Sequence, residues 1–226
     1  MVSTHFGYDP VRDKFKVLRM LRYYGYYVLK VFTIGVDSSW RDIAPEKHVK
    51  ELLSRYYCVK RGLCVNGVIY WIYSYVFLML FDVGTEQLRV IDLAPSAGYP
   101  YLSEVPFHYP DLVEIDCCLC VFKYKDSGMK LWILRDNEAQ VWEEKSFVIP
   151  SAVVSPRDFV FPLCDVPTGE ILLMPYFLSR IVGGVYYDMD TMKFRSVVLM
   201  EMPLTWMQRL GEVDIVFCQE SFRLLK

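Results

Sequence analysis

The sequence predicts an all-β fold, and three of its features indicate this. First, the chain is 54% hydrophobic and 16% aromatic, which is too apolar for disorder and fits strands better than helices. Second, its apolar runs are short, roughly four to eight residues, with turn residues about every eight to twelve positions, as in a sandwich, barrel or propeller. Third, one hairpin motif recurs along the chain, and this repetition favours the propeller.

The recurring motif is an Asp that follows an apolar or aromatic residue and precedes another apolar residue by six positions. It is found at Asp9 with Phe15, at Asp82 with Leu88, and at Asp188 with Phe194. An Asp side chain at the first position of a turn can accept hydrogen bonds from backbone amides about two residues on, which closes the hairpin locally. We therefore expect these three carboxylates to anchor turns rather than to catalyse a reaction.

The N-terminal part of the chain contains predicted strands and one segment with helical spacing. Residues 6–20 are expected to form the first Asp-turn hairpin, followed by an aromatic strand run within 23–36 and a short strand within 38–43. Residues 46–57 repeat apolar side chains at intervals of three and four, which is typical of a helix. An ordered insertion between strands fits the same spacing, so both interpretations stay open.

The strongest local signal is Asn66-Gly67, which lies between apolar residues in the segment 62–71. Asn-Gly in that setting is the preferred two-residue type I′ hairpin turn. The longest apolar run, 68–81, follows directly and covers 14 residues interrupted only by Ser74. Because a membrane-spanning helix needs ~20 apolar residues, we expect two consecutive buried strands here and no membrane partner.

Two proline-rich stretches, Pro95–Pro110 and Pro150–Pro167, are predicted to be loops. The other predicted strands lie within a hairpin at 112–124, segments 129–134, 140–149 and 170–174, the third Asp-turn hairpin at 186–197, and a weaker run at 213–217. Each repeating unit is then a hairpin, a short gap and a second hairpin. This unit has about the ~50-residue length of a kelch-type propeller blade.

Six phrases, taken together and in order, resemble the plant F-box-associated domain of the β-propeller kind. They are Phe6-Gly7-Tyr8-Asp9-Pro10 with 13–17, Ser39-Trp40-Arg41, 62–70 with its Asn66-Gly67, Phe81-Asp82-Val83, Leu131-Trp132-Ile133-Leu134 before Asp136 and Trp142, and Tyr186-Tyr187-Asp188. The resemblance covers about residues 5–199 and is weak over 200–226. It implies one kelch-like F-box-associated β-propeller domain over residues 1–226.

In that family the propeller is joined to an N-terminal F-box, a helical segment that docks onto an adaptor of an SCF-type (cullin-RING) ubiquitin ligase. The propeller is thought to select the protein to be ubiquitylated. Here the family pattern begins only a few residues after Met1. From the resemblance we therefore expect no F-box in this chain, no adaptor or cullin binding by it, and a propeller that is incomplete or open at the N-terminal blade.

The cysteines indicate a reducing compartment, either cytoplasmic or nuclear. There are seven of them, an odd number, and the chain has no Asn-X-Ser/Thr sequon and no signal-peptide core near its start. Cys117-Cys118-X-Cys120 suggests zinc, but adjacent residues of a strand point to opposite faces, so the first two cannot easily share one metal. Cys58, Cys64 and His108 do not complete a site, so we expect buried core cysteines and no metal.

The residues of common catalytic sites are scattered. His5, His48 and His108 lie in a terminus, a charged segment and a proline-rich loop, and no nucleophile elbow accompanies them. Gly183-Gly184 lacks the Lys and the strand-to-helix context of a phosphate loop. The net charge is −2, and aromatic Tyr23–Tyr27 between basic residues is the nearest approach to a polynucleotide-binding sheet, so we expect no nucleic-acid partner.

The function that the sequence favours is a non-enzymatic protein-interaction module that recognises an unidentified protein. Loops on one propeller face would form its contact surface, with Pro95–Pro110 and Pro150–Pro167 as candidates. No catalytic, cofactor-binding or metal residue is predicted. One alternative is a propeller-scaffold enzyme such as a hydrolase, which would need several Asp or Glu side chains to converge in a pocket. Another is a truncated product without a function of its own.

Overall fold

The computed structural model describes residues 2–23, 26–55, 62–74, 76–94, 111–125, 128–148, 160–165, 169–175 and 181–201. The chain divides into two compact units, Met1–Ile149 and Pro150–Lys226. Within the described residues the regular elements are sixteen strands and a single short helix, α1 (Lys47–Arg55). The all-β prediction is confirmed.

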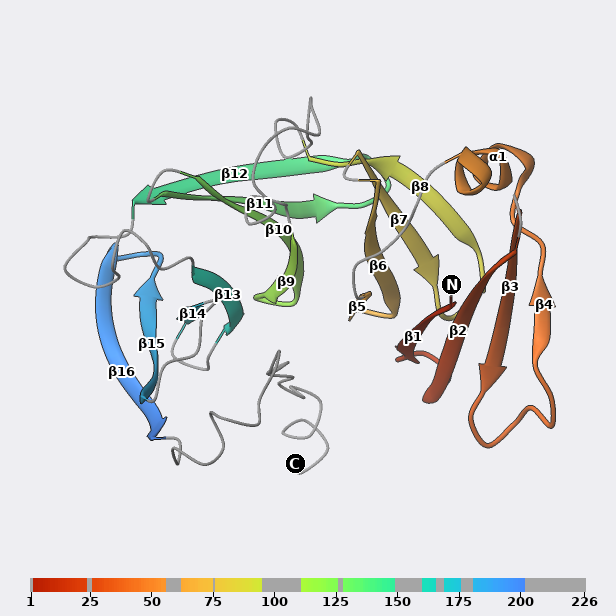
Figure 1. Cartoon of the computed structure of the whole chain (residues 1–226), viewed down its shortest axis with the longest axis horizontal. Helices are drawn as coiled ribbons and strands as arrows, with labels where there is room; N and C mark the ends of the chain where they lie inside the picture. The colour runs from red at the N-terminus through yellow and green to blue at the C-terminus, as the bar shows by residue number, and fades with distance from the viewer. Residues whose placement is uncertain are drawn as a thin grey trace. The chain divides into compact units, whose positions relative to one another are not determined.

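The first unit contains three antiparallel sheets of four strands, each running in sequence order across the sheet. Sheet A contains β1 (Val2–Asp9), β2 (Lys14–Tyr23), β3 (Tyr26–Thr33) and β4 (Arg41–Ile43); sheet B contains β5 (Leu63–Val65), β6 (Val68–Tyr73), β7 (Phe77–Asp82) and β8 (Leu88–Asp92); sheet C contains β9 (Asp111–Ile115), β10 (Cys118–Lys125), β11 (Gly128–Asp136) and β12 (Val141–Val148). Figure 1 labels these strands. Four-stranded meanders of this kind are the blades of propellers.

The second unit contains sheet D, which has the same order: β13 (Val160–Asp165), β14 (Glu170–Pro175), β15 (Ile181–Asp188) and β16 (Lys193–Glu201). The sequence predicted a loop over Pro150–Pro167, and β13 within it shows that this prediction was wrong in part. Pro162 is tolerated because β13 is an edge strand whose register with β14 shifts between Pro162 and Cys164. The predicted elements at Pro95–Pro110 and 213–217 lie outside the described residues.

Two expectations for the N-terminal region have clear outcomes. The segment 46–57 forms a helix over Lys47–Arg55, which confirms the helical interpretation. The first blade was expected to be incomplete, but sheet A has four strands, like the other sheets. The short strand Arg41–Ile43 completes it by pairing with residues 29–31 of β3. The expectation of an incomplete N-terminal blade was therefore wrong for this sheet.

Sheet A buries one face, and its sequence alternates accordingly. In β2, Leu18 and Met20 are buried while Val17 and Arg19 are partly exposed, which is the period of two that a one-sided sheet requires. The buried face packs with sheet B and helix α1 in one apolar cluster. Its members are Leu18, Met20, Leu29, Val31, Val49, Leu53, Ile69, Trp71, Tyr73, Met79, Phe81, Val83 and Leu88.

Sheet B is buried on both faces, because its other face packs against sheet C. The second apolar cluster consists of Val65, Val68, Tyr70, Ile72, Leu78, Leu80, Ile91, Leu93, Ala94, Leu119, Val121, Trp132 and Leu134. Every residue of β6 is buried, with Ile69 and Trp71 facing sheet A and Tyr70 and Ile72 facing sheet C. This explains why the apolar run 68–81 is unbroken rather than alternating.

The Asn66-Gly67 turn has the conformation that the sequence predicted. Asn66 has φ +49° and Gly67 has φ +80°, and a type I′ turn requires positive φ at both positions. The Val83 N–H donates a hydrogen bond of 2.9 Å to the Gly67 carbonyl. A Cβ added at Gly67 would lie 2.9 Å from Pro10 Cδ, so the turn is also in close contact with sheet A.

We predict that Gly67→Ala destabilises the protein more than Gly35→Ala. Both glycines have positive φ, so each alanine costs about 1 kcal/mol of backbone strain. Only at Gly67 does the added methyl group meet Pro10, whereas nothing lies within 4 Å of the methyl group at Gly35. The extra clash adds roughly 1–3 kcal/mol. Urea denaturation of both variants measures this, and equal losses would show that the close approach is unimportant.

Candidate interaction surface

In a four-stranded antiparallel meander the first and third turns lie at the same edge of the sheet, because each strand reverses direction. In sheets A, B and C these turns consist of residues 10–13, 34–40, 66–67, 83–87, 116–117 and 137–140. We call this set the turn surface. Whether it forms one surface depends on the hydrogen bonds that close each turn, the bonds that join neighbouring turns, and the side chains that remain exposed.

Asp side chains close the turns as the sequence predicted. Asp9 Oδ1 accepts hydrogen bonds from Val11 N (3.0 Å) and Arg12 N (3.1 Å). Asp82 Oδ1 accepts one from Thr85 N at 2.6 Å. In sheet D, Asp188 Oδ1 accepts hydrogen bonds from the amides of residues 190 and 191 at 2.9 and 3.0 Å. All three carboxylates lie at the ends of strands and stabilise the reversal that follows.

A fourth turn closed by an Asp side chain was not predicted from the sequence. Asp136 Oδ1 accepts hydrogen bonds from Glu138 N (2.8 Å) and Ala139 N (2.9 Å) at the end of β11. Asp136 precedes Trp142 by the same six positions that separate the other pairs. The signal was therefore present in the spacing.

Charged side chains join the turns of sheets A and B. Arg12 Nη1 donates to Asp9 Oδ2 at 2.9 Å and to the Gly84 carbonyl at 2.8 Å. Glu86 lies in the β7–β8 turn and forms ion pairs with two basic side chains of sheet A. Lys16 Nζ donates to its Oε1 at 2.8 Å, and both terminal nitrogens of Arg41 donate to its carboxylate at 2.7 Å.

This arrangement keeps Glu86 ionised. The hydrogen bonds from Arg41, and after them those from Lys16, outweigh the effect of burial and lower the pKa of Glu86 from 4.5 to about 2. The Lys16 side chain is only 7% exposed, so removing Glu86 would leave a buried cation without its partner. The ion pair therefore constrains how sheets A and B meet.

Polar contacts also join sheets B and C. Asn66 Nδ2 donates to the Cys117 carbonyl at 2.7 Å, which links the β5–β6 and β9–β10 turns. Asn137 Nδ2 donates to the Tyr70 hydroxyl at 3.2 Å. Arg89 of β8 and Glu138 of the β11–β12 turn form an ion pair of 2.6 Å. With the contacts between sheets A and B, these bonds make the turn surface continuous over three sheets.

The comparison with known families agrees with this architecture. A family model described as "F-box associated beta propeller domain" matches residues 1–221. The chain belongs to the F-box-associated β-propeller family. This confirms the resemblance seen in the sequence, and it identifies the four-stranded sheets as parts of a propeller-like fold.

Similar proteins are F-box proteins of Arabidopsis thaliana. F-box protein At2g21930 is 28% identical over 88% of this chain and 51% of its own length, and F-box protein At4g11590 is 29% identical over 84% and 51%. F-box/kelch-repeat protein At3g04660 is 28% identical over 76% of this chain and 47% of its own length. The chain spans about half the length of the curated relatives it matches.

The exposed side chains of this F-box-associated propeller differ along the turn surface. On sheet A, Val11 is 88%, Val36 63% and Ile34 46% exposed. Ile34 N–H donates to the Phe15 carbonyl, which holds the β3–β4 turn beside the start of β2. On sheet C the exposed residues include the acidic Asp116 and Asp136. The exposed side chains thus include apolar ones on sheet A and acidic ones on sheet C.

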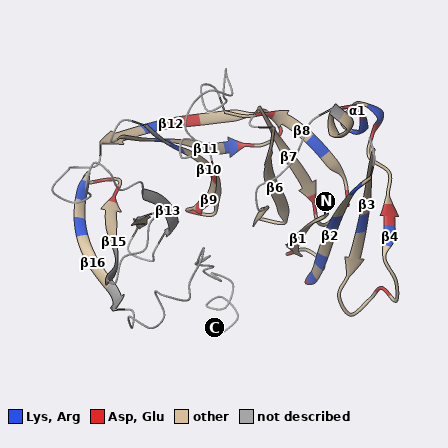
Figure 2. Cartoon of the chain, in the orientation of Figure 1, with Lys and Arg blue, Asp and Glu red and all other residues tan. Residues whose placement is uncertain are grey.

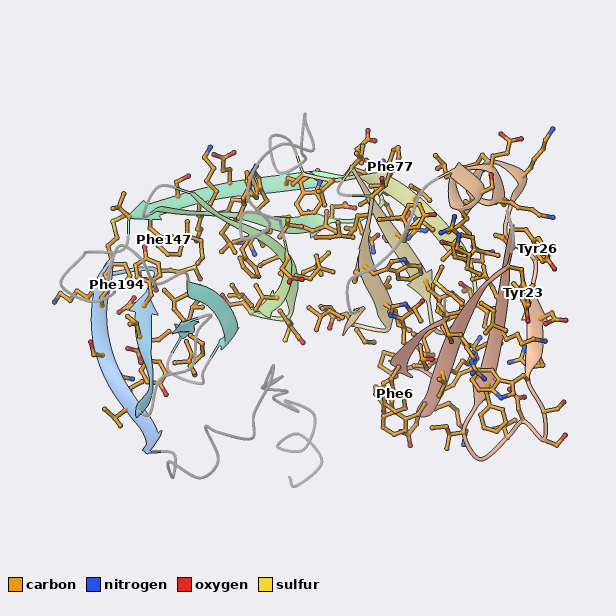
Figure 3. The ribbon with its side chains drawn as sticks, viewed as in Figure 1. Phe6, Tyr23, Tyr26, Phe77, Phe147 and Phe194 are labelled. Atoms are coloured by element: carbon orange, nitrogen blue, oxygen red, sulfur yellow. The ribbon has the colours of Figure 1, made fainter. Side chains whose placement is uncertain are left out.

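Among the described residues, Lys and Arg occur on several strands, including β2 and β8 of the first unit and β16 of the second (Figure 2). In the candidate segment for polynucleotide binding, the described residues are Tyr23 at the end of β2 and Tyr26 and Tyr27 at the start of β3. The rings of Tyr23 and Tyr26 stack at 5.4 Å between centroids, and both lie beside each other in Figure 3. Arg22 lies over the Tyr27 ring at 5.8 Å. These contacts support the expectation of strand packing.

The cysteine prediction holds for Cys120 and fails for its neighbours. Cys120 is buried, and this burial raises the pKa of its thiol to about 12. Cys117 is exposed and Cys118 is partly exposed. The prediction assumed that Cys117 and Cys118 are adjacent residues of one strand. Cys117 instead lies in a turn, with φ +57°. Cys58 and His108 lie outside the described residues.

No metal centre emerges from the part of the chain that the structure describes. That part contains no group of three His, Cys, Asp or Glu residues that could hold a metal ion. His48 is exposed on α1 beside Glu46. Gly183-Gly184 lies within β15, where the register with β16 shifts next to Gly183. Among the described helices, none has the length and apolar character to span a membrane.

His5 is a buried histidine with an altered acidity. Its ring stacks on Trp71 at 5.0 Å, and its Nδ1 accepts a hydrogen bond of 3.1 Å from Gly62 N. Burial lowers the pKa of His5 from 6.5 to about 4. Because Nδ1 is an acceptor, the neutral ring carries its proton on Nε2. Protonation of Nδ1 would break the bond to Gly62.

We predict that Asp82→Ala lowers the free energy of unfolding by about 1 kcal/mol, because the turn loses its bond to the Thr85 amide. Asp92→Ala is the matched control, since Asp92 is an exposed carboxylate at the end of β8. Asp92→Ala should change the free energy of unfolding by less than about 0.5 kcal/mol. Chemical denaturation compares the two variants. If Asp82→Ala unfolds at the same denaturant concentration as the parent, Asp82 does not anchor the turn.

We predict that acid destabilises this propeller through His5 first. The unfolded chain takes up a proton at His5 below pH 6.5 and the folded chain only near pH 4, so stability is lost as the pH falls between these values. The loss is at most about 3 kcal/mol. The lowered pKa of Glu86 also reduces the stability of the folded chain as the pH falls, in the lower range between 4.5 and about 2.

Denaturation at a series of pH values tests this. His5→Phe should keep the stacking on Trp71 and flatten the pH dependence between 6.5 and 4.5, where Glu86 does not yet contribute. His48→Gln changes an exposed histidine and should leave the dependence as it is in the parent. An unchanged slope in His5→Phe would assign the acid sensitivity to another group.

Proposed function

We propose that this F-box-associated propeller is a non-catalytic protein-recognition module that contacts its partner through the turn surface. The observation that carries the proposal is the continuous layer of turns across sheets A, B and C, joined by Glu86 on one side and Asn66 on the other. Loops held by a rigid scaffold are the usual place for binding. Val11 and Val36 present exposed apolar side chains there, which a partner can bury.

The state of the carboxylates supports recognition over hydrolysis. A hydrolase would need Asp or Glu side chains to face a substrate with free oxygens and altered acidity. Asp9, Asp82, Asp136 and Asp188 instead accept hydrogen bonds from the backbone amides of their own turns. Burial raises the pKa of Asp9, but bonds from Arg12 and Val11 outweigh it and the pKa falls. A carboxylate whose oxygens are bonded to its own turn suits a structural role.

The family places the propeller in proteins that carry an F-box. We propose that, in such a protein, this domain selects the protein that a cullin-RING ligase ubiquitylates. The adaptor and the cullin would be bound by other segments and not by residues 1–226. We further propose that these residues act as one propeller domain, which the family match over 1–221 supports, and that the domain works in the cytoplasm or nucleus.

The test is a binding experiment with paired variants. The tagged chain is used to capture proteins from a plant extract, and a captured protein is then purified and its affinity measured directly. Val11→Asp with Val36→Asp should weaken binding at least about tenfold, because charges replace apolar contacts at the turn surface. Val148→Asp is the control, since Val148 is 71% exposed at the far end of β12.

Four results would count against the proposal. Capture of no protein would remove the binding role. Equal affinity of the double variant and the parent would show that the partner does not contact the turn surface. A loss of affinity in Val148→Asp as large as that in the double variant would show the same. A non-cooperative melt of the parent chain would favour the alternative of a truncated product, so the melt is recorded first.

A further inference from the structure

The β9–β10 turn contains a pair of adjacent cysteines that the proposed function does not use. Asp116 and Cys117 form the turn with φ +51° and +57°, so it resembles the Asn66-Gly67 turn of sheet B. The second position of such a turn favours glycine, and here it is a cysteine. Cys117 is exposed, and Cys118, the first residue of β10, is partly exposed.

The turn conformation removes the strand geometry that would separate the two thiols. Side chains of adjacent strand residues diverge by about 180°, whereas helix-like backbone brings the angle to roughly 100°. Cys117 has a left-handed, helix-like φ of +57°, so the rule of opposite faces does not apply to this pair. Both residues are reachable from solvent, in contrast to Cys120 two positions later.

A cation lies beside one of the two sulfurs. Arg135 Nη1 is 3.6 Å from Cys118 Sγ, and the guanidinium is held in place by Glu143, whose Oε2 accepts from Arg135 Nε at 2.7 Å. The guanidinium is placed to stabilise negative charge that develops on this sulfur as it reacts. The geometry therefore gives Cys118 the role of the attacking sulfur and Cys117 that of its resolving partner.

We propose that Cys117 and Cys118 are a redox-sensitive dithiol that a peroxide converts reversibly into a disulfide. The Cys118 thiolate attacks one oxygen of hydrogen peroxide; the S–O bond forms, the O–O bond breaks, and hydroxide leaves and is protonated to water. The Cys117 thiol then attacks the sulfenic sulfur; the S–S bond forms, and a second water carries away the hydroxyl group and the thiol proton. Peroxide is reduced and the two thiols are oxidised.

Such a disulfide would be easily reduced and would disturb the turn. Adjacent Cα atoms are about 3.8 Å apart across a trans peptide, below the usual range of about 4.4–6.8 Å for a disulfide, so the bond is strained. Its formation must change the backbone at Cys117, whose carbonyl accepts the 2.7 Å bond from Asn66 Nδ2. Oxidation would therefore weaken one of the contacts between sheets B and C. The proposal is independent of whether the turn surface binds a protein.

The experiment exposes the purified chain to hydrogen peroxide, alkylates the remaining thiols with iodoacetamide in denaturant, and locates the modified residues by mass spectrometry. We expect Cys117 and Cys118 to escape alkylation, to lose one hydrogen atom each, and to be alkylated again after treatment with dithiothreitol. Cys120 should stay alkylatable throughout, because it is buried with a pKa of about 12. Cys117→Ser should stop at a sulfenic acid on Cys118 that dimedone traps.

Two arginine variants test the role of the cation. Arg135→Gln should slow the oxidation roughly three- to tenfold, because the cation 3.6 Å from the reacting sulfur is removed. Arg195→Gln is the matched control, since Arg195 makes a similar pair with Glu170 in sheet D, away from these cysteines in the chain. Equal slowing in the two variants would remove Arg135 from the proposal.

The effect on the turn is read from thermal unfolding. Oxidation should lower the Tm of the parent chain, and it should lower the Tm of Asn66→Ala less, because the bond to the Cys117 carbonyl is already absent there. Three outcomes would overturn the proposal: both cysteines stay alkylatable after peroxide, either one pairs with a different cysteine, or Cys120 is oxidised as fast as Cys118.

Discussion

The structure of the first unit depends on the burial of sheet B on both faces. β6 contributes side chains alternately to the cluster with sheet A and to the cluster with sheet C, and all of its residues are buried. A strand with two apolar faces cannot be satisfied by one neighbour, so sheets A and C must both cover it. Fully burying a large apolar side chain contributes about 1.5–3 kcal/mol, which makes this stacking the dominant stabilising term.

The stacking places the turns of neighbouring sheets side by side and so creates the candidate surface. Polar bonds then set the alignment of the sheets: Glu86 pairs with Lys16 and Arg41 on one side of sheet B, and Arg89 pairs with Glu138 on the other. Apolar packing is not directional, whereas these pairs require defined positions. Recognition by a propeller surface needs such alignment, because a partner must contact turns from several sheets at once.

Local features were predictable to the extent that their bonds are local. The Asn66-Gly67 turn and the anchors Asp9, Asp82 and Asp188 follow from contacts within a few residues, and Asp136 could have been found by the same spacing. The Cys117-Cys118 pair was misjudged because period-two alternation was assumed through a turn. In sheet A, the completing strand β4 lies within the short strand expected at 38–43, so only the expectation of an incomplete first blade, which came from the family pattern, was wrong.

By itself the sequence determined the all-β class, most strands, the turn chemistry and the family. These depend on spacing and side-chain type, which the chain carries in its order of residues. Only the tertiary structure decided that Glu86 meets Lys16 at 70 residues' separation, that Asn66 reaches the Cys117 carbonyl, and that Arg135 lies beside Cys118. Such contacts depend on which sheet faces stack and in what register, and no local pattern specifies either.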